Sequence, residues 1–345
     1  MSQFECVRIT SMAEVDLDRY AFNYDLTFCI LLMRADGHHY HTYGGRTGED
    51  PHSHLSVESL TAVLLQTLAE VRESPPPPPA PASPGRTVED YPPLARRIAA
   101  DRRPPCVHCH NVNDWWMQTE VEAGRWSRDR AWIYPDPSQL GLAFDSFEQN
   151  RLTQAPAKSG LRVGDRIVTA GGIPVLTFGD FSRALDRAPT AGSLPLEVVR
   201  FSEPGSSTRL AIDLALPAGW REPSPRQFAW RAIQWNLQPA PGFGGPVLSP
   251  AELQSHGLPA DGFAFRIQYF VTWGPRRNTG INAGQSGLRE GDLVLSAGDR
   301  DHFDSIEHFH AWFRLTRKVG EVVPIEILRD GERLEIELSV VGPKI

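Results

Sequence analysis

The sequence predicts a multi-domain α+β protein. Three patterns carry this prediction: two strand-like runs followed by an amphipathic helix near the N-terminus, a proline-rich tract, and a series of short strand and helix patterns that occurs twice in the second half. With 345 residues, 41% of them hydrophobic, the chain can bury two or three cores. The expected divisions are an N-terminal domain (1–73), a linker (74–87), a tryptophan-rich segment (88–137), two copies of a repeated unit (138–216 and 260–345) and the connector between these copies (217–259).

The N-terminal domain begins with strand patterns. Phe4–Arg8 is a candidate short strand, and Leu26–Arg34 is an apolar run of strand length. Asp36-Gly37 then predicts a hairpin turn into residues 38–43, because glycine tolerates the positive φ that such turns need. Apolar residues at helical spacing over residues 56–71 predict an amphipathic helix packed on this hairpin.

Strand, turn, strand, Gly-Gly and helix in this order, over residues 4–72, resemble the C-terminal half of a thioredoxin fold. The resemblance implies a partial thioredoxin-like α/β unit without the half that would carry a redox-active Cys-x-x-Cys. Asp25-Leu26-Thr27 stands where thioredoxins place a cis-proline. Either the domain is degenerate or the chain begins downstream of its true start. We favour the second interpretation, because a half sheet leaves strand edges unpaired.

The proline-rich tract is expected to act as a spacer. Residues 74–86 read SPPPPPAPASPGR, and proline both removes a backbone donor and fixes φ. An extended, semi-rigid polyproline linker follows, with docking of a recognition module as the less favoured alternative.

The second half of the chain repeats itself. Gly141-Leu142-Ala143-Phe144 recurs as Gly262-Phe263-Ala264-Phe265, and the SGLRVGD turn that ends at Asp165 recurs as SGLREGD ending at Asp292. Five matched elements in the same order indicate one unit used twice. The other three are a helix carrying Phe181 or Phe309, a first strand at 195–200 or 324–329, and a second strand at 209–214 or 333–338. The connector, with Trp220, Trp230 and Trp235, is expected to be poor in strands and to pack its indoles between the two copies.

The repeated unit resembles a PDZ domain of the bacterial kind, over about residues 138–216 and 260–341. The resemblance implies two PDZ-like β-barrel or sandwich units. In that family the loop matching Gly141–Phe144 offers backbone N–H groups to the C-terminal carboxylate of a peptide, which adds a strand alongside. Gly262–Phe265 is expected to do the same in the second copy, so the expected partners are protein or peptide C-termini. A purely architectural role, with the grooves filled by the chain itself, is an equal alternative.

Reactive side chains gather at Cys106-Val107-His108-Cys109-His110. A Cys-x-x-Cys-His turn places two thiols and an imidazole on one side, which indicates covalent haem c bound by Cys106 and Cys109 with His110 as the proximal iron ligand. No sixth ligand is evident. The candidates to wall a porphyrin are Trp115, Trp116, Trp126 and Trp132. The candidates to face its propionates are Arg96, Arg97, Arg102 and Arg103, although a solvated helix face is the preferred interpretation of these arginines.

Other interpretations of the two thiols stay open. Cys106 as nucleophile and Cys109 as resolving thiol would make a redox dithiol, with charge supplied by His108 and Arg103. A zinc site lacks a second cysteine pair, and inert cysteines remain an alternative. Upstream, His39 and His41 share one strand face and His38 lies on the other, so surface histidines are preferred there over a metal site.

Composition and motifs exclude several classes of function. A net charge of −7 argues against nucleic acid as a partner, and no apolar run is long enough to span a bilayer. Ser286 is not a candidate protease nucleophile, because it matches Ser159 in the repeated turn, and no Gly-x-Ser-x-Gly elbow is present. The chain is therefore not expected to be a serine protease, and no signal peptide is visible.

The whole arrangement resembles bacterial thioredoxin-like/PDZ proteins, some of which are selenoproteins. This resemblance, with the Cys-x-x-Cys-His motif, implies an exported, periplasmic, redox-associated protein whose redox partner is unknown. A thiol-disulfide oxidoreductase and a non-catalytic PDZ scaffold are the alternatives.

Overall fold

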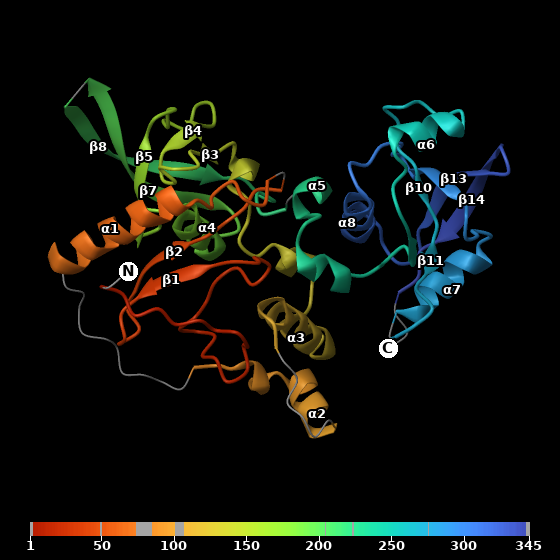
Figure 1. The fold of residues 1–345 in the computed structure, drawn as a ribbon, viewed down its shortest axis with the longest axis horizontal. Coiled ribbons are helices and arrows are strands. Elements are labelled where there is room, and N and C mark those ends of the chain that lie inside the picture. Colours follow the sequence, from red (N-terminus) through yellow and green to blue (C-terminus); the bar gives the residue numbers. More distant parts are fainter. Residues whose placement is uncertain are drawn as a thin grey trace. The chain divides into compact units, whose positions relative to one another are not determined.

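The computed structural model describes residues 3–342 except 49, 74–84, 101–106, 204, 223 and 275. Most of the predicted linker tract, with Arg102, Arg103 and Cys106, thus lies outside the described residues. The fold is a mixed α+β arrangement of small sheets and short helices (Figure 1). The chain forms two compact units, Met1–Pro223 and Ser224–Ile345. No helix in the described part of the chain is long and apolar enough to cross a membrane.

The N-terminal hairpin and helix form as the sequence predicts. Strands β1 (Ile30–Met33) and β2 (His39–Tyr43) pair antiparallel, and Gly37 at the turn has φ 97°. Helix α1 (Val57–Glu73) packs on them around a small core of Leu32, Tyr43 and Val63. The predicted strand at 4–8 is wrong: these residues have no regular structure, and Val7 is 80% exposed, because no neighbouring strand is there to pair with them.

Three helical segments follow the linker region. They are η1 (Val88–Asp90), α2 (Pro92–Ala100) and α3 (Cys109–Glu122). Apolar residues from the N-terminal loop and from these segments share one core, which includes Met12, Leu94 and Val107. Two short 3-10 helices, η2 (Arg128–Ala131) and η3 (Pro137–Leu140), lead into the first repeated unit.

The first repeated unit contains a four-stranded antiparallel sheet in the order β6-β5-β7-β8 and a separate pair, β3-β4. The predicted helix around Phe181 is α4, and the predicted strands 195–200 and 209–214 lie inside β7 and β8. The bounds are β3 Ala143–Phe144, β4 Leu152–Gln154, β5 Arg166–Ala170, β6 Ile173–Pro174, α4 Phe178–Arg187, β7 Gly192–Glu203 and β8 Ser206–Leu216.

The second unit of the chain has a matching sheet in the order β10-β12-β13-β14 and a separate pair, β9-β11. The predicted helix around Phe309 is α8, and the two predicted strands are β13 and β14. The bounds are α5 Pro225–Phe228, η4 Ala232–Asn236, β9 Phe243–Gly244, α6 Pro250–Ser255, β10 Phe265–Arg266, β11 Tyr269–Phe270, α7 Arg277–Gln285, β12 Leu293–Ala297, α8 Ile306–Thr316, β13 Val322–Arg329 and β14 Glu332–Ser339.

A buried ion pair confirms the repeat in atomic detail. In the first copy Arg200 donates from Nε and Nη2 to the carboxylate of Asp165 at 2.8 and 2.7 Å, and Nη2 also donates to the Gly160 carbonyl. In the second copy Arg329 makes the same contacts with Asp292 at 2.7 and 2.7 Å and with the Gly287 carbonyl. Both aspartates are 1% exposed at the side chain, so each copy of the SGLRxGD turn is fixed by the same arginine clamp.

Backbone pairing corrects one match between the copies. Leu152 accepts from Gly164 and donates to Asp165, and Ile267 makes the same bonds with Gly291 and Asp292. Leu152 and Ile267 are therefore equivalent positions. The strand before Leu152 in the first copy, with Ala143 opposite Gln154, corresponds to β9 in the second, with Gly244 opposite Tyr269.

The counterpart of Gly141–Phe144 is consequently residues 242–245, and the match to Gly262–Phe265 is wrong. Phe263, Ala264 and Phe265 instead lie on the segment that enters β10, where all three are buried. The turn glycines Gly141 and Gly242 share a left-handed conformation, with φ 70° and 86°.

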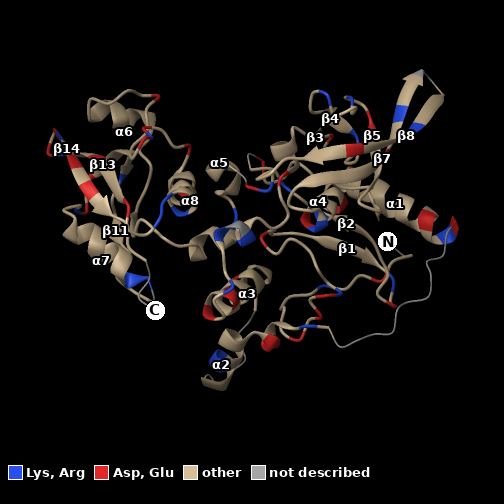
Figure 2. Ribbon diagram, turned by 180° about the vertical axis from the view of Figure 1, so that it is seen from behind, with Lys and Arg blue, Asp and Glu red and all other residues tan. Residues whose placement is uncertain are grey.

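The connector does not behave as a separate element. Trp220 is buried in the core of the first repeated unit, with Nε1 donating to the Pro189 carbonyl, whereas residues from Ser224 onward belong to the second compact unit. The second compact unit therefore contains residues 224–259 together with the predicted second copy. Figure 2 shows acidic and basic residues interspersed in both units, for example along β13 and β14.

Candidate functional site

The described residues of the Cys-x-x-Cys-His segment, 107–110, do not form the expected single helical turn. Helix α3 begins at Cys109, and the residue before it, His108, is extended with φ −76° and ψ 157°. Val107 is 3% exposed and its carbonyl accepts a bond of 2.7 Å from Met12, so this residue ties the segment to the N-terminal loop. Cys106, a predicted haem attachment point and candidate nucleophile, lies outside the described residues.

The remaining predicted residues of this site lie in different surroundings. The Cys109 thiol is half-buried with Sγ 3.7 Å from the Leu26 carbonyl, and burial raises its pKa. The imidazole of His110 is exposed and stacks on His108, with ring centroids 5.7 Å apart. The packed, protonated thiol of Cys109 and the exposed imidazole of His110 do not support the prediction that a porphyrin binds between them. Haem c and the redox dithiol therefore stay predictions from the sequence.

The aromatic and basic residues around this segment contact one another. Arg96 pairs with Glu122 at 2.6 Å, and the Arg97 guanidinium lies 5.7 Å from the Trp115 ring. Trp116 packs edge-on against Trp126. The two arginine contacts join α2 to α3 and agree with the interpretation of the arginines as a helix surface.

The N-terminal histidines are not all at the surface, which corrects the prediction for that group. His41 is 2% exposed, and its ring nitrogens lie 2.7 Å from Asp180 of α4 and 2.8 Å from Glu70 of α1. Burial alone would lower the pKa of His41, but the hydrogen bonds to the two carboxylates raise it to about 9. His54 is also buried, and it stacks on Phe178 with ring centroids 4.0 Å apart. Across the described residues, no group of three or more His, Cys, Asp or Glu side chains is arranged to hold a metal ion.

These histidines attach the hairpin to the first repeated unit. Asp180 also accepts from the Thr42 backbone N–H at 2.7 Å, and Thr177 donates to the Thr42 carbonyl. The backbones approach so closely that a Cβ at Gly179 would lie 2.4 Å from the Thr42 carbonyl oxygen. Helix α4 is thereby covered by the chain's own hairpin, and only its last residue, Arg187, is exposed.

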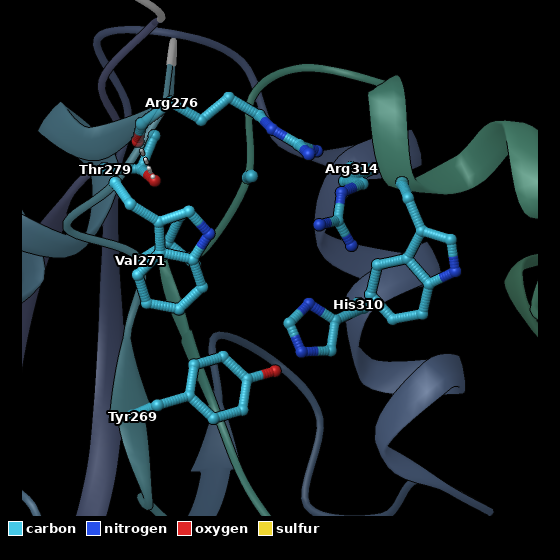
Figure 3. Close-up of a pocket in the computed structure, with 10 residues that line it drawn as sticks. Tyr269, Val271, Arg276, Thr279, His310 and Arg314 are labelled. Carbon is cyan, nitrogen blue, oxygen red and sulfur yellow. Dashed lines mark hydrogen bonds between the residues drawn. The ribbon is translucent and has the colours of Figure 1, made fainter. Parts of the chain in front are cut away.

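A pocket of about 470 Å³ opens in the second unit. It lies between α8, which contributes His310 and Arg314, and the opposite wall at β11 and the start of α7, which contributes Tyr269 and Arg276 (Figure 3). Its other lining residues are Trp235, Ala240, Gly242, Val271, Trp273 and Thr279. The pocket therefore has aromatic walls and two arginines, and it borders the turn glycine Gly242.

Arg314 is the most unusual side chain of this pocket. The residue is 4% exposed, yet Nε and Nη1 have no hydrogen-bond partner among the residues that the structure describes. Its guanidinium lies over the Trp235 ring at 5.0 Å. Burial lowers the pKa of Arg314 from its ordinary 12.5 to about 9, and the nearby positive charge of Arg276 acts in the same direction. A buried cation without a counter-ion is costly, which makes Arg314 a candidate binding residue for an anionic group.

His310 adds a second unsatisfied group. It is 3% exposed, and neither ring nitrogen has a partner among the described residues. Burial, with the charge of Arg314, lowers the pKa of His310 well below its ordinary value, so the ring is neutral. A neutral imidazole can donate one hydrogen bond and accept another.

Glycines keep the pocket open. A Cβ at Gly244 would lie 2.6 Å from the Tyr269 hydroxyl and 3.0 Å from Nε2 of His310, so a methyl group there would fill the space between them. At Gly242 and Gly280, an added Cβ would lie 2.3 Å from the backbone of Thr279 and 2.4 Å from that of Val271. Only glycine allows α7 to approach the β9-β11 pair this closely.

The equivalent positions in the first repeated unit carry different side chains. The helix caps Thr177 and Ser305 are equivalent, so Asp186 stands at the position of Arg314, and Ser182 at that of His310. Asp186 accepts the backbone N–H of Tyr134 at 2.9 Å. Tyr134 precedes Gly141 by seven residues, as Trp235 precedes Gly242. The position of Gly244 is taken by Ala143. The two copies therefore differ in charge and in hydrogen bonding at these matched positions.

Comparisons with known proteins give little. No family model matches the sequence, and no curated protein matches it. Similar solved structures include the HtrA-type protease AlgW with a decapeptide (TM-score 0.27, 19% identity, covering 56% of this chain and 55% of that one) and a substituted AlgW with a tripeptide (TM-score 0.27, 15% identity, 56% and 59%). This chain spans little more than half the length of those structures. Likeness at this level does not show a shared fold.

Proposed function

We propose that the chain is a non-catalytic scaffold with two PDZ-like units, of which the second binds the C-terminal end of a peptide or protein. The order of elements that the two copies share, a turn, a short strand pair, and a four-stranded sheet with the helix α4 or α8, supports the PDZ-like interpretation. The matched arginine clamps at Asp165 and Asp292 support a common origin of the two copies.

The observation that carries the proposal is the difference between matched positions of the two copies. In the second copy a pocket lies between α8 and the turn that begins at Gly242, with polar groups of Arg314 and His310 left unpaired among the described residues. In the first copy α4 is covered by the N-terminal hairpin, and Asp186 is paired with Tyr134. The first copy therefore serves as architecture, and the second is available to a ligand.

The expected binding mode follows from the position of β9. This short strand pairs with β11 on one side, with Gly244 opposite Tyr269. A peptide would extend along its other edge toward α8, with its terminal carboxylate at the turn of residues 242–245. The ligand's last side chain would then enter the pocket.

Selection from a library of random decapeptides with free C-termini, against the full chain, tests the proposal. Gly244→Ala should abolish enrichment, because the new methyl group would press against Tyr269 and His310, two side chains that line the pocket. Gly284→Ala is the matched control, since this glycine lies in α7 with nothing within 4 Å of an added Cβ. Enrichment that depends on a free C-terminus and on Gly244 supports the proposal. No enrichment, or enrichment unchanged by Gly244→Ala, would overturn it.

A further inference from the structure

We infer that the pocket of the second unit selects a ligand whose last residue is acidic, Asp or Glu, and that Arg314 pairs with its side-chain carboxylate. This inference rests on the proposed function and names the ligand class of the same site. It assigns Arg314 as the residue that determines specificity.

The pocket carries positive charge. Arg314 forms no ion pair among the described residues, and the charged residue that lines the pocket with it is Arg276. Figure 3 shows the Arg276 side chain extending from the opposite wall toward Arg314. The Arg314 guanidinium, buried beside the Trp235 ring, places a positive charge in a region of low dielectric, where an anion is bound more strongly than in water.

Arg314 lies outside the turn that would hold the ligand's terminal carboxylate. It lies on α8, two turns beyond its start and next to the pocket lined by Tyr269 and Val271, and it does not belong to the turn of residues 242–245. A terminal carboxylate held at the turn leaves the guanidinium to the side chain of the last residue. A carboxylate there can accept two parallel N–H bonds from the planar guanidinium.

Other kinds of last side chain would leave Arg314 either unpaired or with its charge uncompensated. An aliphatic last side chain would close the pocket over Arg314 and leave Nε and Nη1 unpaired in an even drier space, which is unfavourable for a buried charge. An amide side chain would pair with them but would not neutralise the charge. An acidic side chain satisfies both requirements, and neutral His310 can donate one further hydrogen bond to it.

The first copy offers an internal contrast. The position of Arg314 holds Asp186, which is satisfied by the Tyr134 backbone N–H at 2.9 Å, and the position of His310 holds Ser182. Arg314 and His310 are thus particular to the second copy. Structural demands shared by the two copies do not account for it.

Four pools of fluorescein-labelled decapeptides test the inference, each random at nine positions and ending in Glu, Gln, Leu or Phe with a free carboxylate. Titration into the full chain, followed by fluorescence anisotropy, should give tighter binding of the Glu pool than of the Gln pool by roughly tenfold to a hundredfold, as expected for a hydrogen-bonded charged pair. In Arg314→Gln this ratio should fall to about one, while Gly284→Ala should retain it.

The outcomes separate the inference from the function on which it rests. Equal binding of all four pools, or a preference for Leu or Phe, would overturn the acidic specificity and leave peptide binding in place. Binding of no pool would overturn both. If the preference for Glu persists in Arg314→Gln, Arg314 is not its cause. The ratio of Glu to Gln binding is first measured on the unsubstituted chain, so the test of acidic specificity does not depend on how Arg314→Gln folds.

Discussion

Replacing Arg314 by methionine should stabilise the second unit of the free protein while removing its preference for acidic ligands. The guanidinium is buried at 4% exposure, and two of its nitrogens have no partner among the described residues. Methionine keeps an unbranched stem of similar reach in the same space and carries no charge. The substitution therefore removes an unfavourable burial without opening a large cavity.

The magnitude follows from the lowered pKa of Arg314. A fall from 12.5 to about 9 corresponds to roughly 5 kcal/mol against the charged form, at about 1.36 kcal/mol per pH unit. Loss of the cation–π contact between Arg314 and the Trp235 ring, at 5.0 Å, reduces the expected gain in stability by about 1–2 kcal/mol. Relaxation around the charge reduces the remainder, so the expected gain is about 1–3 kcal/mol.

Urea unfolding followed by circular dichroism measures this change, with Arg329→Met as the matched control. Arg329 is paired with buried Asp292, so the same substitution there should cost about 3–5 kcal/mol, because it leaves a buried carboxylate alone. The transition that Arg329→Met lowers identifies the second unit. If Arg314→Met lowers the same transition, Arg314 is compensated within the chain and the argument for an anionic ligand fails.

Two further predictions concern the first unit. His41 has a pKa of about 9 in the folded protein, above its ordinary 6.5, so its contribution to stability is complete below about pH 6.5 and is lost as pH rises through 9. In His41→Gln, the fall in unfolding free energy over that pH range should be smaller by roughly 2–3 kcal/mol. An unchanged pH dependence would contradict the buried charge cluster. Gly179→Ala should lower the melting temperature, because the added Cβ would lie 2.4 Å from the Thr42 carbonyl oxygen. The control Gly284→Ala should change the melting temperature little or raise it. Equal effects of the two substitutions would refute close docking of the hairpin on α4.

Much of the second half can be predicted because its signals are local. The SGLRxGD turns and the strand pairs ending at Leu214 and Leu338 are set by short patterns, and the structure places them where these patterns indicate. The hairpin at Gly37 and helix α1 follow for the same reason. Periodicity and turn chemistry depend on neighbours in sequence, which a sequence alone displays.

The turn of the second copy is predicted at the wrong place because of an insertion. Ten residues lie between Gly141 and Leu152, whereas twenty-four lie between Gly242 and Ile267. Helix α6 lies within this longer interval, and Gly262–Phe265 happens to repeat the letters of the first turn nearer to the expected spacing. Only backbone pairing distinguishes the two segments, and that pairing is not local.

The candidate pocket escapes prediction for a related reason. His310 and Arg314 stand in the helix sequence IEHFHAWFRLT, whose apolar pattern conceals that both face inward. Extending the match of Phe309 with Phe181 along the helix aligns them with Ser182 and Asp186 and exposes the change of charge. Likewise, the burial of His41 depends on Asp180, which lies 139 residues away in the chain.

Hydrogen–deuterium exchange on the full chain, with and without the decapeptide pool ending in Glu, tests the central claim most directly. The account predicts slower exchange at residues 242–248 and along α8 when the peptides are bound, with no change at residues 141–146 or along α4. Protection of α4 and the turn at Gly141, with none around Gly242, would contradict it.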